Sequence, residues 1–319
     1  MNYYNKYLKY KNKYLKLVAG QSKKKNIYIG TLNLSFAVQE ELEAEWPSEE
    51  DFVRHCKNKY NNIRNCYYNS LKLINNLINK NVVLFGFQEV VKNINKNPDD
   101  LLLNLQKNKT FKNEFSYAEG KSRNTRNKAY ARTLLIWKTK LFGKEINRLN
   151  FNLALDFDEC EHDARDCVII YTDKNYLLIN VHFPWIDTEE QIVMVQNRIN
   201  EELSTIKIDK NPKIIITGDF NDATGKINKN NPLVLSINKK NIELHNNMTS
   251  SQIKKDLLSC CWHKQPHKKG WGHYDAPGDY VLSNNFINKN FIYNTSKFLG
   301  KNAFYSDHKL VLGLYREKK

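Results

Sequence analysis

Residues 214–222 read IIITGDFND, an apolar run that ends abruptly in a glycine and polar side chains. A strand this apolar is buried on both faces, and open sheets bind ligands just beyond the carboxyl ends of such strands. Asp219 and Asn221 are two residues apart, so an extended continuation would place the carboxylate and the amide on the same side. A buried strand followed by an Asx-rich turn accounts for the segment equally well. The rest of the sequence has to distinguish these two interpretations.

Short apolar runs of the same kind recur from residue 27 onward and predict many strands. Besides KIIITGDF (213–220), they are IYIGTLNL (27–34), VVLFGF (82–87), RTLLIW (132–137), CVIIY (167–171), YLLINVHF (176–183), DYVLS (279–283) and LVLGLY (310–315). Two segments place apolar residues at helical spacing. The first runs from 53 to 78, and the second carries Val193, Ile199, Leu203 and Ile206. Without an internal repeat or a flexible linker, this pattern predicts one α/β (α+β) domain over residues 27–319.

The composition is that of a globular, basic protein. The chain has 319 residues, of which 41% are hydrophobic, and this is enough for a large core. Fifty Lys and Arg against 34 Asp and Glu give a net charge of +16, which favours polyanionic partners such as nucleic acid or an acidic membrane surface. Lysine and asparagine also occur in runs such as NKNVV and NKNNP, so part of the basicity fits a biased genome composition.

Residues 1–26 form a basic leader in which KYLK occurs at positions 6 and 13. The seven-residue spacing indicates a short helix with an aromatic and aliphatic edge, suited to a membrane surface, nucleic acid or a partner protein. A frayed, solvated leader fits the same composition.

Six cysteines, at positions 56, 66, 160, 167, 260 and 261, lack a CxxC pair and the compact spacing of a disulfide scaffold. A reducing compartment is therefore expected. No apolar run reaches the roughly 18 residues of a membrane span, and the amino terminus lacks the apolar core of a secretion signal. We expect a soluble, intracellular and monomeric protein.

Polar residues of a restricted kind lie at the ends of the predicted strands. They are Asn33, Gln88, Glu89, Asn180, His182, Asp219, Asn221, Asp279, Asp307 and His308. Each alone has an ordinary explanation as a helix cap, a solvated charge or a structural histidine. Together they supply hard oxygen ligands and two histidines without a cysteine partner, a set that suits Mg²⁺ or Mn²⁺ bridging to phosphate oxygens.

The order of these motifs resembles the endonuclease/exonuclease/phosphatase superfamily. The matching elements are Asn33, Gln88-Glu89, His182, Gly218-Asp219-Phe220-Asn221, Asp279 and Ser306-Asp307-His308. GDFN and SDH together are specific, whereas QE alone is weak. The resemblance runs from about residue 27 to 316 and implies a deoxyribonuclease I-like four-layer sandwich of two packed mixed β-sheets flanked by helices. The leader and the asparagine-rich composition resemble proteins of giant DNA viruses.

The resemblance also implies a division of labour. Glu89 would bind the metal, with Asn33 beside it and Asp307 contributing directly or through water. Asp219 would orient or deprotonate the attacking water, and Asn221 would hold that water or a phosphate oxygen. The pair of Asp279 and His308 would place an imidazole nitrogen against the phosphate, since a carboxylate favours the charged form of its imidazole. His182 would be a second phosphate contact or a general acid.

Two further positions concern the substrate. Arg165 stands where many nucleases of the superfamily place an arginine near the scissile phosphate. Deoxyribonuclease-like members pair the histidine at the position of His182 with a glutamate just before the strand here written RTLLIW, and this chain has Tyr130, Ala131 and Arg132 there. Without that carboxylate His182 is a doubtful charged acid, and Tyr130 is a candidate phosphate contact instead.

The segment CCWHKQPHKKGWGHYD (260–275) is expected to be a basic, aromatic loop beside Asp279. It would stack bases and neutralise phosphates, or its tryptophans would simply pack. Zinc binding by His263 and His267 on one helix face is a weaker alternative, because two adjacent cysteines rarely take two tetrahedral positions.

Three functions fit the sequence. The first is metal-dependent hydrolysis of phosphodiesters in nucleic acid, as an endonuclease, an exonuclease or an end-processing enzyme. The alternative is a phosphatase or phospholipase C-type hydrolase that acts on inositol phosphate or sphingolipid headgroups. A catalytically dead binding module is the third, and the retained Glu89, Asp219 and His308 count against it.

Overall fold

The computed structural model describes the greater part of the chain after the leader. The described residues are 26–34, 56, 64–92, 101–120, 123–124, 130–153, 165–184, 186, 188–222, 224–263, 273–284, 287–299, 305–306 and 308–316. Residues 1–25 of the leader and Asp307 lie outside these ranges.

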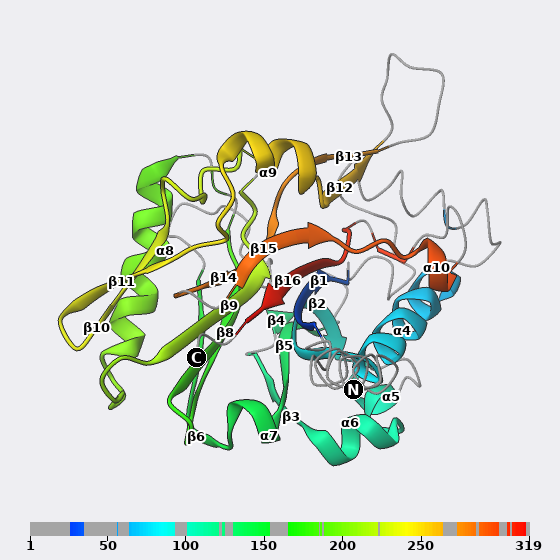
Figure 1. Ribbon diagram of the computed structural model, residues 1–319, viewed down its shortest axis with the longest axis horizontal. Helices are drawn as coiled ribbons and strands as arrows, with labels where there is room; N and C mark the ends of the chain where they lie inside the picture. Colours follow the sequence, from blue (N-terminus) through cyan, green and yellow to red (C-terminus); the bar gives the residue numbers. More distant parts are fainter. Residues whose placement is uncertain are drawn as a thin grey trace, which may run out of the picture.

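Two β-sheets form the body of the protein (Figure 1). The first has the strand order β15-β16-β1-β2-β5-β3, with β4 also paired to β5. Its strands are β1 (Ile27–Asn33), β2 (Val82–Lys92), β3 (Phe115–Glu119), β4 (Arg123–Asn124), β5 (Tyr130–Lys138), β15 (Ile287–Ile292) and β16 (Val311–Tyr315). The second has the order β14-β9-β8-β7-β6. Its strands are β6 (Glu145–Asn152), β7 (Asp166–Thr172), β8 (Tyr176–His182), β9 (Lys213–Asp219) and β14 (Asp279–Ser283).

Each sheet contains one parallel pair among antiparallel neighbours. In the first sheet β1 and β2 are parallel and are connected through helix α4 (Arg64–Ile78). In the second, β8 and β9 are parallel and are connected through α8 (Glu189–Leu203). A crossover helix is the usual way to join parallel neighbours, and it brings both carboxyl ends to the same edge of the sheet. Both sheets are therefore mixed.

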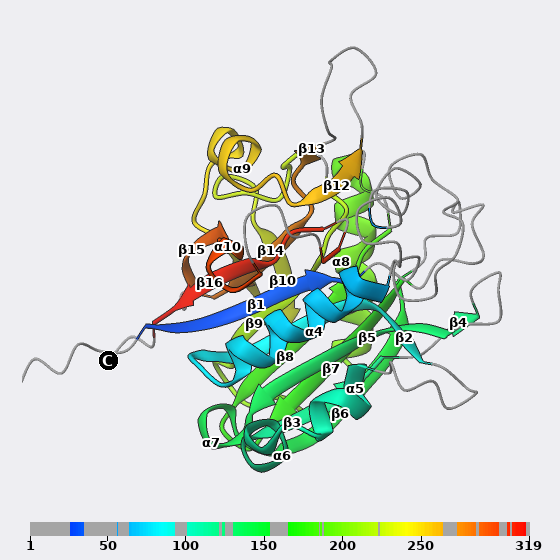
Figure 2. The ribbon, with the colours of Figure 1, turned by 90° about the vertical axis from the view of Figure 1, so that its right-hand side faces the viewer.

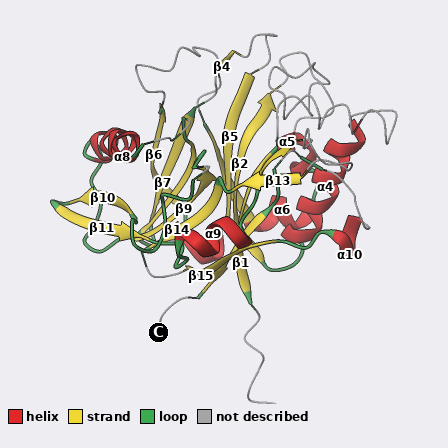
Figure 3. Cartoon of the chain, turned by 90° about the horizontal axis from the view of Figure 1, so that it is seen from above, coloured by secondary structure: helices red, strands yellow, loops and turns green. Residues whose placement is uncertain are grey.

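Three apolar clusters pack the layers together. Figure 3 shows the two sheets lying between α8 on one side and α4 on the other. One cluster fills the space between the sheets. A second packs α4, α5 (Leu101–Gln106) and α6 (Lys109–Glu114) on the outer face of the first sheet. The third packs α8, α9 (Ser250–Asp256) and the hairpin of β10 (Leu233–Ile237) and β11 (Lys240–Leu244) on the outer face of the second. Helix, sheet, sheet and helix make four layers, so the predicted sandwich is confirmed.

Short elements complete the description. They are α7 (Thr139–Phe142), α10 (Ser296–Leu299), β12 (Cys260–His263) and β13 (His273–Ala276). Strands β12 and β13 pair as an antiparallel hairpin that projects from the sandwich (Figure 2). The expectation of a loop over 260–275 is thus wrong at both ends of that segment. His263 belongs to a strand and cannot share a helix face with His267.

All eight predicted strands occur, with ends shifted by a few residues. Helix α8 also occurs, but its predicted apolar face was wrong at one position. Val193 is 50% exposed, whereas Ile192, Val195, Ile199 and Leu203 are buried. Ile192 rather than Val193 continues the spacing of three and four residues toward Ile199 and Leu203. No helix among the described residues is long and apolar enough to cross a membrane.

Three of the cysteines are disulfide-bonded, although their spacing in the sequence did not indicate disulfides. Cys56 and Cys66 form a disulfide, with their Cα atoms 6.3 Å apart. Cys260 is also disulfide-bonded, whereas Cys167 is a buried free thiol. The bond between Cys56 and Cys66 joins the first turn of α4 to the segment before it. Cys260, oxidised in this way, does not offer a thiolate to zinc.

Candidate active site

The predicted site residues converge at one rim of the sandwich. Asn33, His182 and Asp219 are the last residues of β1, β8 and β9, so the carboxyl ends of both parallel pairs meet there. Asp279 opens β14, which runs antiparallel to β9, and the register places it directly opposite Asp219. His308 stands shortly before β16. Strand direction alone therefore brings residues from both sheets to the same edge.

A β-bulge delivers the glutamate to this rim. The register of β2 against β5 shifts between Phe87 and Val90, so Gln88 and Glu89 together stand opposite Thr133 and β2 carries one extra residue. Glu89 has φ 53°, in the left-handed region that few residues with a side chain adopt. Bulges of this kind re-aim side chains, and strained backbone is concentrated at functional sites.

Asn33 joins the two acidic residues across the sheets. Its Nδ2 donates to Glu89 Oε1 at 2.9 Å and to Asp219 Oδ2 at 3.0 Å. Asn33 and Asp219 are each 1% exposed. Two carboxylate oxygens that share one amide lie close together, and hydrogen-bond donors and nearby positive charge relieve their repulsion.

Histidines supply part of that charge from either side of Asp219. His182 Nε2 lies 3.7 Å from Asp219 Oδ2 and 3.7 Å from Glu89 Oε1. His308 Nε2 lies 3.8 Å from the same Asp219 oxygen, and its Nδ1 contacts Asp279 Oδ2 at 2.9 Å. The second contact fixes the His308 ring with Nε2 toward Asp219.

The carboxylates have perturbed pKa values. Burial raises the pKa of Asp279 to about 6, with Asp219 adding to the rise and His308 opposing it. Burial also acts to raise the pKa of Asp219, but the charges of His308 and His182 and the bonds from Asn33 and Asn221 outweigh it and lower that pKa. Asp219 is therefore held as a carboxylate, whereas Asp279 sits closer to its protonation point.

The turn after β9 differs from the extended continuation that we expected. Asn221 has φ 46°, so the chain turns there. Its backbone N–H donates to Asp219 Oδ1 at 2.9 Å, and its Nδ2 donates to the Phe183 carbonyl at 2.7 Å. The turn fixes the orientation of the Asp219 carboxylate and ties it to the end of β8. Asp219 and Asn221 are brought together, but by a local hydrogen bond rather than by strand periodicity.

Arg165 contacts His182 directly. Its Nη1 lies 2.5 Å from His182 Nε2. This contact places the fixed positive charge of a guanidinium beside the ring at the rim. Arg132, from the segment that lacks the expected glutamate, is 1% exposed and pairs instead with Glu119, with Nη2 and Oε1 2.7 Å apart. Tyr130 belongs to β5, but its side chain lies outside the described part of the chain, as Asp307 does entirely.

The residues at this rim fit a divalent cation. Glu89 offers the carboxylate oxygens that Mg²⁺ and Mn²⁺ prefer, and Asn33 and Asp219 lie beside it. Asp219, Asp279 and His308 also offer ligand atoms within 4.8 Å of one another. The Glu89 side chain is 14% exposed, so the rim is open to an incoming ion at that point.

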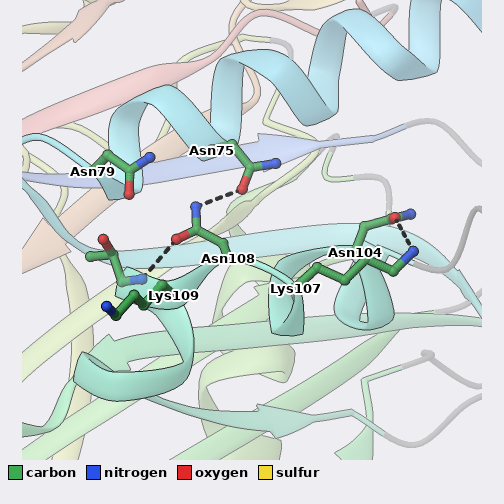
Figure 4. A pocket seen from close by; sticks show the side chains of 7 residues that line it. Asn75, Asn79, Asn104, Lys107, Asn108 and Lys109 are labelled. Carbon is green, nitrogen blue, oxygen red and sulfur yellow. Dashed lines mark hydrogen bonds between the residues drawn. The ribbon is translucent and has the colours of Figure 1, made fainter.

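A separate pocket of about 510 Å³ lies between the ends of α4, α5 and α6 (Figure 4). Its described lining is polar throughout and includes no carboxylate: Asn75, Asn79, Asn104, Lys107, Asn108, Lys109 and Thr110. Asn75 and Asn79 stand at the carboxyl end of α4, which leads into the start of β2. The pocket therefore lies at the opposite rim and is not the site that the strand ends build.

No protein-family model matches the chain, and no curated protein matches its sequence. Solved structures do match over nearly its whole length. An endonuclease/exonuclease/phosphatase family protein from Leptotrichia buccalis C-1013-b has a TM-score of 0.52 at 16% identity, covering 91% of this chain and 100% of that one. ANGEL2, a 2′,3′-cyclic phosphatase, has a TM-score of 0.53 at 12% identity, covering 92% and 95%.

The chain has the endonuclease/exonuclease/phosphatase fold. The resemblance found in the motifs is thus confirmed at the level of the fold. Sequence identities of 16% and 12% say nothing about the substrate.

Sequence reasoning missed the residues beneath this rim. Thr31 and Thr217 are fully buried polar residues, each two positions before a site residue on the same strand. That spacing of two was the available signal, because it places a polar side chain on the same strand face as the site residue.

Proposed function

We propose that this protein hydrolyses phosphodiester bonds with the help of Mg²⁺ or Mn²⁺. The observation that carries the proposal is the position of the Asp219 carboxylate. It is almost fully buried, is held by Asn33 and the Asn221 N–H, and lies within 4 Å of two imidazoles. Hydrolysis of a phosphodiester needs a base for water and positive charge for the phosphate oxygens, and this arrangement offers both.

Glu89 and Asn33 would hold the cation, with Asp307 as the further ligand implied by the motif. Bound there, the ion would neutralise charge that develops on the phosphate oxygens. Glu89 comes from the first sheet and Asp219 from the second, so the cation would lie at the junction of the two sheets.

Asp219 would accept the proton of the attacking water, since its pKa is lowered and it is charged at neutral pH. Asn221 would keep that carboxylate in place through its backbone N–H. His308, fixed by Asp279, would direct Nε2 toward a phosphate oxygen. His182 and Arg165, which lie in direct contact, would serve together as a phosphate contact, and Arg165 would bring the fixed positive charge.

Nucleic acid is the proposed substrate. The chain carries a net charge of +16, and a polyanion gains affinity from such charge through counterion release. The hairpin of β12 and β13 precedes Asp279 in the sequence, and the segment between its strands contains Lys264, Lys268 and Lys269.

The test is an assay of purified protein on single-stranded, duplex and abasic DNA, on RNA and on soluble inositol phosphates and sphingomyelin. Cleavage of nucleic acid with Mg²⁺ or Mn²⁺ that stops with chelator and resumes with added metal is the expected result. Binding should fall steeply with salt. Hydrolysis confined to inositol phosphates or sphingomyelin would overturn the substrate, and no metal-dependent hydrolysis at all would overturn the function.

A further inference from the structure

A layer of buried polar side chains lies directly beneath the site. Thr31, Gln88, Asn180 and Thr217 come from β1, β2, β8 and β9, and all four are 0% exposed. Gln88 precedes Glu89 by one residue, and the other three precede Asn33, His182 and Asp219 by two. The layer therefore underlies every strand that supplies a ligand or a base.

Asn180 is the centre of this layer. Its Oδ1 accepts from Gln88 Nε2 at 2.7 Å and from Thr217 Oγ1 at 3.2 Å. Its Nδ2 donates to the backbone carbonyls of Phe87 at 2.9 Å and Leu134 at 3.3 Å. Two donated and two accepted bonds use the full capacity of an amide. One side chain of the second sheet thus holds two strands of the first sheet.

The two carbonyls that Asn180 binds mark the β-bulge. Phe87 pairs with Leu134 in the register of β2 and β5, and the register shifts immediately after Phe87. A bulge disrupts the regular ladder, and a buried carbonyl without a donor is costly. Asn180 supplies a donor where the chain leaves regular pairing to turn Glu89 into the site.

The absence of a side chain at Gly86 makes space for Thr217 and Asn180 of this layer. A Cβ atom at Gly86 would lie 2.1 Å from Thr217 Oγ1 and 2.2 Å from Asn180 Oδ1. No side chain can occupy that space while both polar atoms stay in place. The glycine of LFGFQE is therefore explained by the close approach of the second sheet, a reason of packing rather than of turn geometry.

We propose that Asn180 is a positioning residue that sets the separation between Glu89 on one sheet and Asp219 and His182 on the other. Partners beyond the ligands orient metal sites, and losing one typically weakens metal affinity by about 10- to 100-fold. The role of Asn180 rests on the proposed function, since it acts through the cation and base of that site.

The test compares Asn180→Asp with Asn290→Asp in the full-length protein. The first variant keeps the shape of the side chain but replaces the amide donor that faces two carbonyls. Asn290 is a matched control, because it is 0% exposed and also binds backbone at an irregularity of a strand pair, through Val281 N at 2.9 Å and Val281 O at 2.8 Å. It does not touch any site residue among the contacts described.

Four quantities are measured for each protein: the Mn²⁺ Kd without substrate, kcat and KM on bis(p-nitrophenyl) phosphate, and Tm without metal. We expect Asn180→Asp to weaken Mn²⁺ binding by about 10- to 100-fold and to lower kcat more than it changes KM. Asn290→Asp should lower Tm and leave the Mn²⁺ Kd unchanged. Thr217→Val, which removes one bond to Asn180, should give a smaller effect in the same direction and serves if Asn180→Asp does not fold.

A wild-type Mn²⁺ Kd and kcat in Asn180→Asp and Thr217→Val would overturn the positioning role while the proposed function stands. So would equal losses of Mn²⁺ affinity in Asn180→Asp and Asn290→Asp. A wild-type protein that binds no Mn²⁺ and hydrolyses no phosphodiester would overturn the proposed function itself, and the positioning role with it.

Discussion

The space between the two sheets has two unlike halves. Away from the active-site rim it is apolar and aromatic, with Trp137, Phe142 and Tyr176 packed between strands of both sheets. Next to the rim the same face of the same strands is polar. Along β8 the inward residues run Tyr176, Leu178, Asn180 and His182, from apolar core through buried amide to the site.

The same order recurs on other strands. Along β9 it is Ile215, Thr217 and Asp219, and along β1 it is Ile29, Thr31 and Asn33. Apolar packing is tolerant of small shape changes, whereas a buried hydrogen-bonded layer fixes one arrangement. The difference indicates that the apolar half supplies stability and the polar half supplies geometry. Substitutions in the two halves should therefore affect different measurements.

The largest expected effect is on turnover, from Asp219→Asn at the top of the polar half. Loss of a general base typically slows a reaction by about 10²- to 10⁴-fold, and an amide cannot accept the water proton. We expect kcat to fall in that range while circular dichroism shows a folded protein. Asp256→Asn, at an exposed acid in α9, is the control and should keep wild-type turnover. Substantial activity in Asp219→Asn would contradict the assignment of the base.

Trp137→Ala, in the apolar half, should act on stability instead. Trp137 is 0% exposed, and its Nε1 donates to the Gly143 carbonyl at 3.1 Å. Truncation of a buried tryptophan costs about 3 to 5 kcal/mol of the free energy of unfolding. Urea unfolding would measure that loss, and kcat of the folded fraction should stay as in wild type. A large fall in kcat with an unchanged unfolding midpoint would show that the two halves are not separable.

The apolar half was the part that the sequence predicted best. Uninterrupted runs such as IIIT and CVIIY predict buried strands by their composition alone, and all eight occurred. The candidate site residues were found because strand ends and short motifs mark them. How they meet was less accessible, since Glu89 is aimed by a bulge and Asn221 by a left-handed turn.

The pairing of Asp279 with His308 was predicted from the motifs and is present, whereas most other contacts between distant segments were not predicted. The layer around Asn180 depends on how the two sheets pack, and no local pattern encodes that packing. The contact of Arg165 with His182 depends on the pairing of β7 with β8. Val193 shows the same limit on a smaller scale. Its apolar character suggested burial, but a shift of one residue on a helix rotates a side chain out of the core.

The pH dependence sharpens the comparison, because Asp279 lies at the polar end with a pKa raised to about 6 by burial. As pH falls through about 6, Asp279 is protonated and no longer stabilises the His308 imidazolium, so activity should fall. Its effect on stability has the opposite sign. The pKa of Asp279 in the folded protein lies above its ordinary value of 3.8. Protonated Asp279 therefore adds to the free energy of unfolding, and this stabilisation is full below pH 3.8 and is lost as the pH rises through about 6.

Asp279→Asn should remove both the acid loss of activity and the acid gain of stability. The effect on activity is measured as kcat/KM from pH 5 to 8 in the wild type and the variant. The acid limb near pH 6 should be present in wild type and absent or displaced in the variant, whose activity is lower throughout. The difference in free energy of unfolding between the two proteins, followed over the same range, measures the second. An unchanged acid limb in Asp279→Asn would assign it to another group.

The smallest expected effect is the loss of one hydrogen bond in the apolar half. Tyr315 and Tyr176 hydroxyls lie 2.8 Å apart, and both rings are nearly fully buried. Tyr315→Phe should cost about 1 kcal/mol of the free energy of unfolding and leave kcat unchanged. Thr217→Val removes one bond of comparable strength in the polar half, so the two variants should match in unfolding and differ in Mn²⁺ affinity. If Tyr315→Phe and Thr217→Val both lowered the free energy of unfolding and neither changed the Mn²⁺ affinity, the buried polar layer would contribute to stability alone, as the apolar half does.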